Sequence, residues 1–281
     1  MSNITPGVLY LVATPIGNLS DLSTRAADIL RDVDFIAAED TRVTRKLLLF
    51  LGIKKPLVSY YKHNIKSSGE KILTRIKNGE SCALVSDAGT PGISDPGEEL
   101  VRLCIAESIC INIVPGACAV VSALTLSGLK AERFTFEGFL SNDNKKRKAH
   151  LDELKTEKRT MVFYEAPHKL LRTLKDLLIT LGDRNVSVSR ELTKIYEETL
   201  RMSLSQAIEH FEATAPRGEF TLVIEGAVDL ESDTESKLNE GVKLARSFID
   251  NGLSSGDAAK KAAAETGCSR NVLYKIIIAK S

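Results

Sequence analysis

The N-terminal part of the chain alternates between short apolar runs and amphipathic stretches. The apolar runs have the length of buried strands, and they cover Val8–Ala13, Asp34–Ala38, Leu57–Ser59, Cys82–Val85 and Ile111–Val114. The stretches between them have helical spacing and cover Leu22–Leu30, Thr41–Leu51, Lys66–Lys77 and Glu98–Ala106, with Pro115 opening a further helix. Alternation of this kind predicts an α/β domain in which helices cover both faces of a mostly parallel sheet.

The pattern changes after Arg133, where longer strands with period-two alternation follow one another. These predicted strands cover Phe134–Phe139, Met161–Glu165, Val186–Glu191, Glu197–Leu204 and Glu219–Gly226. Two or three helices separate them. The alternation indicates a second α/β domain that contains antiparallel strand pairs.

The last part of the chain has a different composition. Asp229–Asn239 is polar and acidic, and we interpret it as a linker. Beyond it, Gly241–Ser281 contains three short helical patterns with a basic charge balance, which is typical of a helix-turn-helix unit. A packing appendage or a dimer contact would have the same pattern. The predicted domains are therefore residues 1–119, 120–228 and 237–281.

The stretch from Ser86 to Gly97 reads SDAGTPGISDPG and connects a buried strand to a helix. Its glycines permit tight turns and close approaches, and its prolines stiffen the loop. Asp95, Pro96 and Glu98 have the pattern of a helix start, with Asp95 as the N-cap. Loops at the carboxyl ends of parallel strands are where open α/β sheets bind ligands. Asp87 is then placed to bind an ammonium group or hydroxyls of a ligand.

Four more motifs end predicted strands with small and polar residues. They are ATPIGN at residues 13–18, AEDTR at 38–42, VPGACA at 114–119 and FYEAPHK at 163–169. Carboxylates, a tyrosine and a histidine at strand ends are groups that an enzyme uses to bind ligands and to move protons. Together they predict one site to which both α/β domains contribute.

The net charge of the chain is +1, but the charge is unevenly distributed. From Thr41 to Lys77 there are ten Lys and Arg residues and one acid, so 10 − 1 = +9. A second basic run is Lys145–Lys148. Clustered cations are typical of a surface that binds a polyanion such as a nucleic acid. A solvated helix face with a basic loop is the alternative interpretation.

Other features limit the setting of the protein. The five cysteines form no CxxC pair and the four histidines are scattered, so we expect no metal site. The N-terminus has no basic region before its first apolar run, and no apolar stretch is long enough for a membrane span. We expect a cytoplasmic protein that has no membrane contact.

Taken together, the motifs resemble those of the tetrapyrrole methylase family, and within it a branch that acts on ribosomal RNA. The motifs that carry the resemblance lie in order between about residues 7 and 226: ATPIGNLSDLS, AAEDTRVTRKLL, SYYKHN, SDAGTPGISDPG, VPGACAVVSAL, FYEAPHK and GEFTLVIEG. The resemblance implies two α/β domains with a cleft for S-adenosyl-L-methionine between them. It also implies a homodimer that 2′-O-methylates a cytidine ribose of small-subunit (16S) ribosomal RNA near the decoding centre, with the assembled subunit as the expected substrate and no role for DNA.

The resemblance and the motifs together assign candidate residues. Expected cofactor-binding residues are Thr14, Asp87, Ala88, Gly89, Thr90, Ser94, Ala117, Cys118, Tyr164 and Ala166. Candidate general bases are Glu165 first, then Glu39 and His63, and each could instead be a positioning group. Expected RNA-binding residues are Arg42, Arg45, Lys46, Lys62, Lys145, Lys146 and Arg147.

Three other functions fit parts of the pattern. A methyltransferase for a tetrapyrrole-like small molecule would have no need for the +9 stretch or for the C-terminal unit. An RNA-binding or ribosome-assembly protein could keep the fold without catalysis. A nicotinamide dehydrogenase is disfavoured because no GxGxxG follows the first strand, and a phosphate-loop enzyme because GxxxxGK[ST] is absent.

Overall fold

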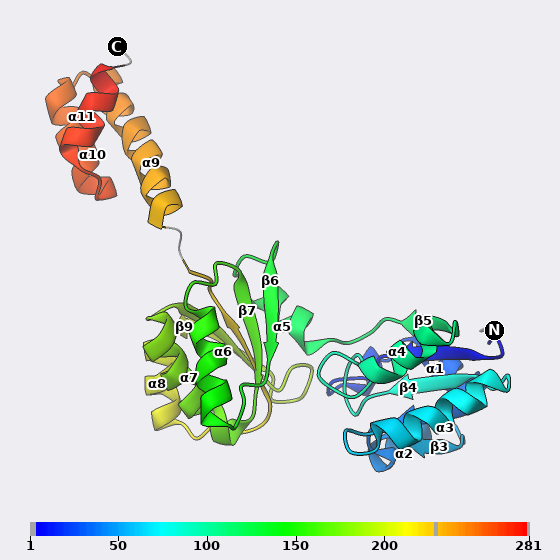
Figure 1. The fold of residues 1–281 in the computed structure, drawn as a ribbon. Helices are drawn as coiled ribbons and strands as arrows, with labels where there is room; N and C mark the ends of the chain where they lie inside the picture. Colours follow the sequence, from blue (N-terminus) through cyan, green and yellow to red (C-terminus); the bar gives the residue numbers. More distant parts are fainter. Residues whose placement is uncertain (1–3, 228–229, 280–281) are drawn as a thin grey trace. The chain divides into compact units, whose positions relative to one another are not determined.

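The computed structural model describes residues 4–227 and 230–279 (Figure 1). Its contacts divide the chain into two compact units. The first comprises residues 1–155 and 159–225 and contains two five-stranded sheets; the second comprises residues 156–158 and 226–281 and contains three helices. The expected boundary at residue 119 falls inside the first unit. In the described part of the chain, no helix is long and apolar enough to cross a membrane.

The first sheet is entirely parallel, with the strand order β3-β2-β4-β1-β5. Its strands are β1 (Val8–Val12), β2 (Phe35–Ala38), β3 (Leu57–Ser59), β4 (Cys82–Val85) and β5 (Cys110–Val114). The helices between them are α1 (Thr24–Asp32), α2 (Thr41–Phe50), α3 (Ile65–Lys77) and α4 (Glu98–Ala106), and a 3₁₀ turn, η1, covers Leu19–Asp21. The predicted parallel α/β sheet is therefore confirmed.

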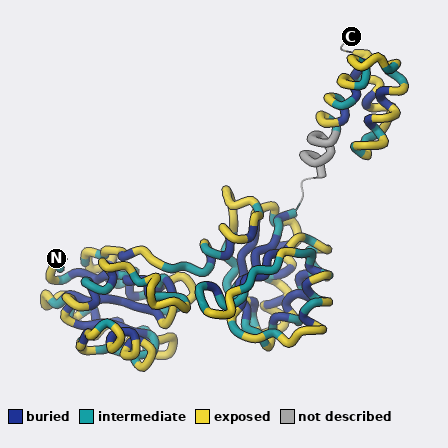
Figure 2. The backbone as a smooth tube through the Cα atoms, turned by 180° about the vertical axis from the view of Figure 1, so that it is seen from behind, coloured by how far each residue is buried: buried dark blue, intermediate teal, exposed yellow. Residues whose placement is uncertain are grey.

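Helices cover both faces of this sheet. On one face, Leu30 of α1 and Leu48 of α2 pack with the strand residues Val12 and Ile36. On the other face, α3 and α4 pack against Leu9, Phe35 and Leu84. β2 and β4 are buried along their whole length (Figure 2). Buried strands of this kind need apolar residues on both faces, which explains their continuous apolar runs.

The second sheet is mixed, with the order β6-β7-β10-β8-β9, in which only β6 and β7 are parallel. Its strands are β6 (Phe134–Gly138), β7 (Thr160–Glu165), β8 (Asn185–Arg190), β9 (Glu198–Ser203) and β10 (Phe220–Ile224). The expected antiparallel pairs are confirmed. Three helices pack on one face: α6 (Asn144–Leu154), α7 (Pro167–Leu181) and α8 (Leu204–Ala213). The other face packs against α5 (Ala119–Ser127), through Val120 and Leu124.

Two helix starts differ from the sequence-based expectation. Pro115 does not open a helix, because α5 begins at Ala119 with Cys118 as its N-cap. Asp95 does not cap α4, whose N-cap is Gly97 and which has no side-chain cap. The Asp-Pro pattern instead belongs to the turn before the helix, where Asp95 reaches the site described below.

The second unit is a three-helix bundle of α9 (Leu230–Asp250), α10 (Ser255–Thr266) and α11 (Arg270–Ile278). Its core contains Ala245, Ala259, Ala262, Leu273 and Ile277. The expected linker over Asp229–Asn239 is wrong from Leu230 onward, since α9 begins there; residue 229 lies outside the described residues. Residues 230–239 contain no Gly or Pro, and the helix-favouring residues Leu, Glu and Lys make up five of the ten, so the polarity of the segment did not prevent helix formation.

Candidate functional site

A cavity of about 410 Å³ lies in the first unit, and elements of both sheets line it. From the first sheet it receives Glu39, which follows β2, and the loop after β4 from Asp87 to Asp95. From the second it receives Tyr164 and Glu165 of β7 and residues of β8 and β10. Its volume is in the range of sites for small molecules and cofactors.

The structure brings most of the expected cofactor-binding and catalytic residues to this cavity. Ten of them line it: Glu39, Asp87, Ala88, Gly89, Thr90, Ser94, Cys118, Tyr164, Glu165 and Ala166. The carboxyl ends of parallel strands meet at one edge of a sheet, so motifs that are far apart in the sequence converge there.

The backbone of the glycine loop is held in place at two points. Gly89 adopts φ +84°, which favours glycine, and it exchanges two backbone hydrogen bonds with Thr14. Gly97 lies against Gly92, so a Cβ atom on Gly97 would come within 2.9 Å of the Gly92 backbone. The loop therefore has little freedom to move, and its shape defines one wall of the cavity.

Three carboxyl groups of the cavity, those of Glu39, Asp87 and Asp95, have raised pKa values. Burial raises the pKa of Glu39, and the negative charges of Asp95 and Asp87 raise it further. Burial likewise raises the pKa values of Asp87 and Asp95, and a neighbouring aspartate adds to each shift. Closely spaced carboxylates in a partly desolvated site favour a cationic ligand.

Asp40, beside them, has a different role. Its carboxylate accepts a hydrogen bond from the Arg42 backbone N–H at 2.8 Å, so it caps α2. The Arg42 side chain pairs with it at 2.6 Å, and these hydrogen bonds lower the pKa of Asp40 to about 2. Its charge is thus already balanced by α2 and Arg42.

Aromatic and small residues form the wall from the second sheet. Tyr164 packs edge-on against Phe136 at 4.9 Å between ring centroids, and Phe139 lies at 5.6 Å from it. Tyr164 is paired with Thr221 across the sheet, and Thr221 with Ser189. Directly paired residues point to the same face, so these three side chains reach the cavity together.

Glu165 lines the cavity, but its two oxygens are already engaged. Only 3% of the residue is exposed; Oε1 accepts a hydrogen bond from the Ala166 backbone N–H at 2.8 Å and Oε2 accepts one from the Thr173 hydroxyl at 2.5 Å. A general base needs a free lone pair directed at its substrate. This geometry favours the positioning alternative for Glu165 over its ranking as first candidate base.

The structure contradicts the expected RNA contact of Arg147. The residue is 3% exposed, and its guanidinium pairs with Asp176 at 2.6 Å and donates to the Thr173 hydroxyl at 2.8 Å. Its neighbours Lys145 and Lys146 are exposed. Consecutive residues of a helix point about 100° apart, so one residue of a basic run in α6 faces inward.

Three expected site residues lie away from the cavity. Thr14 is buried and its hydroxyl donates to the Ser86 carbonyl, so it supports the glycine loop from a neighbouring hollow. The Ala117 carbonyl accepts a hydrogen bond from Thr90 and does not line the cavity. His63 belongs to a separate hollow at the start of α3, with Lys62 and Lys66.

Residues that sequence reasoning missed come mainly from the second sheet and from apolar positions. They are Ile16, Ile93, Asp95, Ala119, Phe139, Pro167, Ser189, Leu192, Glu219, Phe220 and Thr221. Asp95 was part of a quoted motif but was interpreted as a helix cap. Thr221 was also part of a quoted motif, GEFTLVIEG, whereas no quoted motif contains Ser189; strand register places both beside Tyr164.

The other six expected RNA-binding cations are all exposed. Arg42 pairs with Asp40, while Arg45, Lys46 and Lys62 form no ion pair with another described residue. Lys46 lines a second hollow, of about 230 Å³, together with Asp87. Because Asp87 also lines the larger cavity, a cationic side chain of α2 lies next to the acidic site. Among the described residues, no cluster of three or more His, Cys, Asp or Glu side chains is arranged to hold a metal ion.

Comparisons with known proteins agree with this architecture. The model of the family described as Tetrapyrrole (Corrin/Porphyrin) Methylases matches residues 8–208. Among solved structures, the fold is similar to a cobalt-precorrin-4 methyltransferase of cobalamin biosynthesis, with a TM-score of 0.58 and 17% identity over 80% of this chain and 98% of that one. A uroporphyrin-III C-methyltransferase from Thermus thermophilus has a TM-score of 0.56 and 18% identity, covering 78% of this chain and 94% of that chain. The chain therefore belongs to the tetrapyrrole methylase family.

Within the family, the sequence is similar to proteins named ribosomal RNA small subunit methyltransferase I. The relative from Synechocystis is 48% identical over 96% of this chain and 97% of its own length. The Bacillus subtilis relative is 46% identical, covering 95% of this chain and 91% of the relative. The Thermotoga maritima relative is 49% identical over 220 residues, which are 78% of this chain but 99% of the relative. That relative thus has no counterpart for about a fifth of this chain.

Proposed function

We propose that the protein is a methyltransferase for small-subunit ribosomal RNA that uses S-adenosyl-L-methionine and 2′-O-methylates a cytidine ribose near the decoding centre. The observation that carries the proposal is the acidic cavity with the cationic α2 side chain of Lys46 beside it. Family membership and the names of the relatives support the reaction and the RNA. The proposal includes a cytoplasmic homodimer and an assembled subunit as substrate.

The cavity fits the proposed cofactor in its chemistry. S-adenosyl-L-methionine carries a cationic sulfonium and an ammonium group, and when bound it supplies an electrophilic methyl group. Glu39, Asp87 and Asp95 provide negative charge without an ion-pair partner in the described residues. Tyr164 and Phe139 provide an aromatic wall for a flat base. These residues, with the backbone of Ala88 to Thr90, would hold the cofactor.

The chain contributes alignment, exclusion of water and proton acceptance. The walls of the cavity restrict the orientations of a ribose hydroxyl, and alignment of this kind lowers the barrier of a two-reactant step. Glu39 is the remaining candidate base, because it lines the cavity and its raised pKa lies nearer to neutrality than that of an ordinary carboxyl. Glu165 acts by positioning, and His63 lies at another hollow.

Cations around the cavity would bind the RNA backbone. Arg45 and Lys46 of α2 and Lys62 before α3 are exposed on the same half of the unit that carries the glycine loop. Phosphate contacts supply most of the affinity of such proteins and fix the position of the RNA. Lys145 and Lys146 of α6 would extend this surface.

The decisive experiment uses methyl-labelled S-adenosyl-L-methionine. The pure protein is incubated with small ribosomal subunits from cells that lack it, and the RNA is digested to nucleosides. Label in 2′-O-methylcytidine is the expected result. Label on a base would overturn the ribose assignment, and absence of label despite bound cofactor would favour a tetrapyrrole-like small molecule. Failure to bind the cofactor in calorimetry would favour a non-enzymatic RNA-binding protein.

A further inference from the structure

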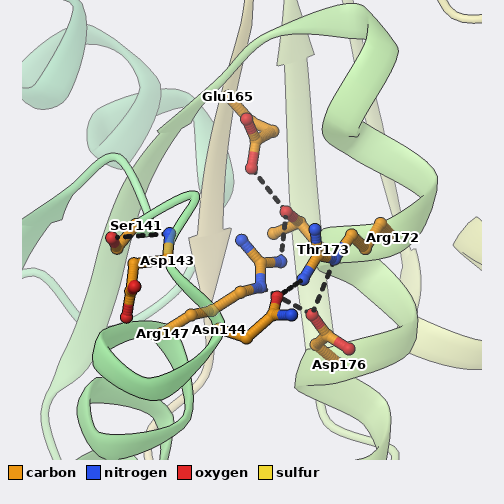
Figure 3. A network of polar contacts seen from close by, with 8 residues as sticks. All are labelled: Ser141, Asp143, Asn144, Arg147, Glu165, Arg172, Thr173 and Asp176. Atoms are coloured by element: carbon orange, nitrogen blue, oxygen red, sulfur yellow. Dashed lines mark hydrogen bonds and ion pairs between the residues drawn. The ribbon is translucent and has the colours of Figure 1, made fainter.

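A chain of polar contacts runs from the surface of the first unit to the cavity. It connects Asp176, Arg147, Thr173 and Glu165, which come from α6, α7 and the end of β7 (Figure 3). Arg147, Thr173 and Glu165 are each at most 3% exposed. Buried polar groups destabilise a protein unless their hydrogen bonds are satisfied. A network that satisfies them holds its members in fixed orientations, and this network ends at a residue that lines the cavity.

The direction of each hydrogen bond follows from the groups involved. A guanidinium only donates, so the Thr173 oxygen accepts from Arg147 Nη2 at 2.8 Å. The single hydroxyl proton of Thr173 then goes to Glu165 Oε2 at 2.5 Å. Arg147 is itself oriented by Asp176, whose Oδ2 accepts from Arg147 Nε at 2.6 Å. Thr173 therefore presents a donor, and only a donor, to Glu165.

The other oxygen of Glu165 fixes the backbone of the cavity wall. Oε1 accepts the N–H of Ala166, which is the N-cap of α7 and has no side-chain cap of its own. Tyr164, Ala166 and Pro167 on either side of this bond all line the cavity. The orientation of the Glu165 carboxylate therefore fixes the position of the backbone around Ala166, which forms this part of the cavity wall.

We propose that Thr173 and Arg147 are positioning residues of the cavity: they orient Glu165, and Glu165 holds the Ala166 wall in the shape that accepts the cofactor. This proposal rests on the proposed function, because it takes the cavity to hold S-adenosyl-L-methionine. Neither Thr173 nor Arg147 lines the cavity, so their effect passes through Glu165. Removal of the Thr173 hydroxyl would leave Glu165 Oε2 buried without a donor, and the side chain would turn away from Ala166.

The test compares Thr173→Val, which keeps the shape and loses the hydroxyl, with Thr173→Ser, which keeps the hydroxyl. We expect Thr173→Val to raise the Kd for S-adenosyl-L-methionine about tenfold in calorimetry, and Thr173→Ser to bind like the native protein. In assays of subunit methylation, KM for the cofactor should rise in Thr173→Val while kcat stays nearly unchanged. Thr180→Val is the matched control, because it makes the same substitution seven positions further along α7. Its Kd and KM for the cofactor should equal those of the native protein.

A second readout needs no ligand. Amide hydrogen exchange at Ala166 should accelerate in Thr173→Val and stay native in Thr173→Ser. If Thr173→Val does not fold, Asp176→Ala decides, because Asp176 is partly exposed and the substitution removes the acceptor that orients Arg147; weaker cofactor binding and faster exchange are expected.

The outcomes separate the two proposals. Native affinity and native exchange in Thr173→Val, or an equal loss in Thr173→Ser, would overturn the positioning role. If the native protein binds no S-adenosyl-L-methionine while exchange at Ala166 still accelerates in Thr173→Val, the proposed function fails and the positioning of the wall stands.

Discussion

At the scale of single residues, the carboxylates of the cavity lower the stability of the ligand-free protein and would favour the binding of a cation. Glu39, Asp87 and Asp95 are partly desolvated and repel one another, which is why their pKa values are raised. A group whose pKa is higher in the folded than in the unfolded chain binds protons more tightly when folded. Its contribution to stability therefore decreases as the pH rises through that interval. A bound cation would offset this cost.

This sign predicts the pH dependence of cofactor binding. Protonation of the three carboxylates removes their attraction for a cationic ligand, and their raised pKa values place this loss above the range of an ordinary aspartate, at about 3.9. We expect the affinity for S-adenosyl-L-methionine, measured by calorimetry, to begin to fall above pH 4 as the solution is acidified. An affinity that stays constant down to that pH would contradict the electrostatic role.

Asp95→Asn isolates one of these charges. The substitution relieves repulsion, so we expect the free energy of unfolding of the ligand-free chain to rise by up to about 1 kcal/mol, the usual trade-off at a binding site. The Kd for the cofactor should rise about tenfold and the acid-side loss of affinity should become smaller. Thermal melts with and without the cofactor measure both effects. A variant that melts lower and binds normally would make Asp95 a structural residue.

At the scale of elements, the connection from β4 to α4 depends on two glycines that touch. A Cβ atom on Gly97 would meet the N and Cα atoms of Gly92 at 2.9 Å, and backbone atoms cannot turn away as a side chain does. We expect Gly97→Ala to cost about 2 kcal/mol of stability and to weaken cofactor binding, since the loop must shift. Gly256→Ala in α10 is the control: it meets no atom within 4 Å and should be neutral or stabilising. Denaturant titrations compare the two.

The position of α2 relative to the sheet makes a prediction about RNA. Lys46 lies beside Asp87 at the carboxyl ends of the strands. Lys54 precedes β3, so it lies toward the amino-terminal ends of the strands of the parallel sheet. Both are exposed. We expect Lys46→Glu to weaken binding to small subunits and to lower the salt slope by about one, with Lys54→Glu close to native. Equal effects of the two substitutions would indicate that the RNA-binding cations are spread over the surface and are not concentrated around the cavity. Filter binding over a salt series measures this.

At the scale of the whole molecule, the two units have separate cores. The bundle of α9, α10 and α11 has its own apolar cluster, and the described residues that line the cavity belong to the first unit. The Thermotoga relative has no counterpart for about a fifth of this chain. We therefore expect a chain that ends at Ala227 to fold, to bind S-adenosyl-L-methionine with native affinity and to lose part of its affinity for small subunits. Calorimetry and subunit binding measure the two effects; loss of cofactor binding would show that the bundle supports the cavity.

Much of this architecture could be predicted from the sequence because it depends on local pattern. Continuous apolar runs with helical stretches between them predicted the parallel sheet, since buried strands need apolar side chains on both faces. The glycine loop and the motifs at strand ends predicted the cavity, because parallel strands end at one edge. Ten expected residues meet there. The polar segment that became the start of α9 shows the limit of composition as a guide.

Only the tertiary structure decided the direction of those side chains whose chemistry allows more than one role. Arg147 stands in a basic run typical of an RNA contact, but α6 turns it inward to Asp176 and Thr173. Glu165 has the chemistry of a base, but the backbone N–H of Ala166 and the hydroxyl of Thr173, on the following helix, occupy its oxygens. Ser189, which lies in no quoted motif, reaches the cavity through its strand register with Thr221. Residue type and spacing are local properties of the sequence, whereas hydrogen-bond partners are decided by contacts between distant segments.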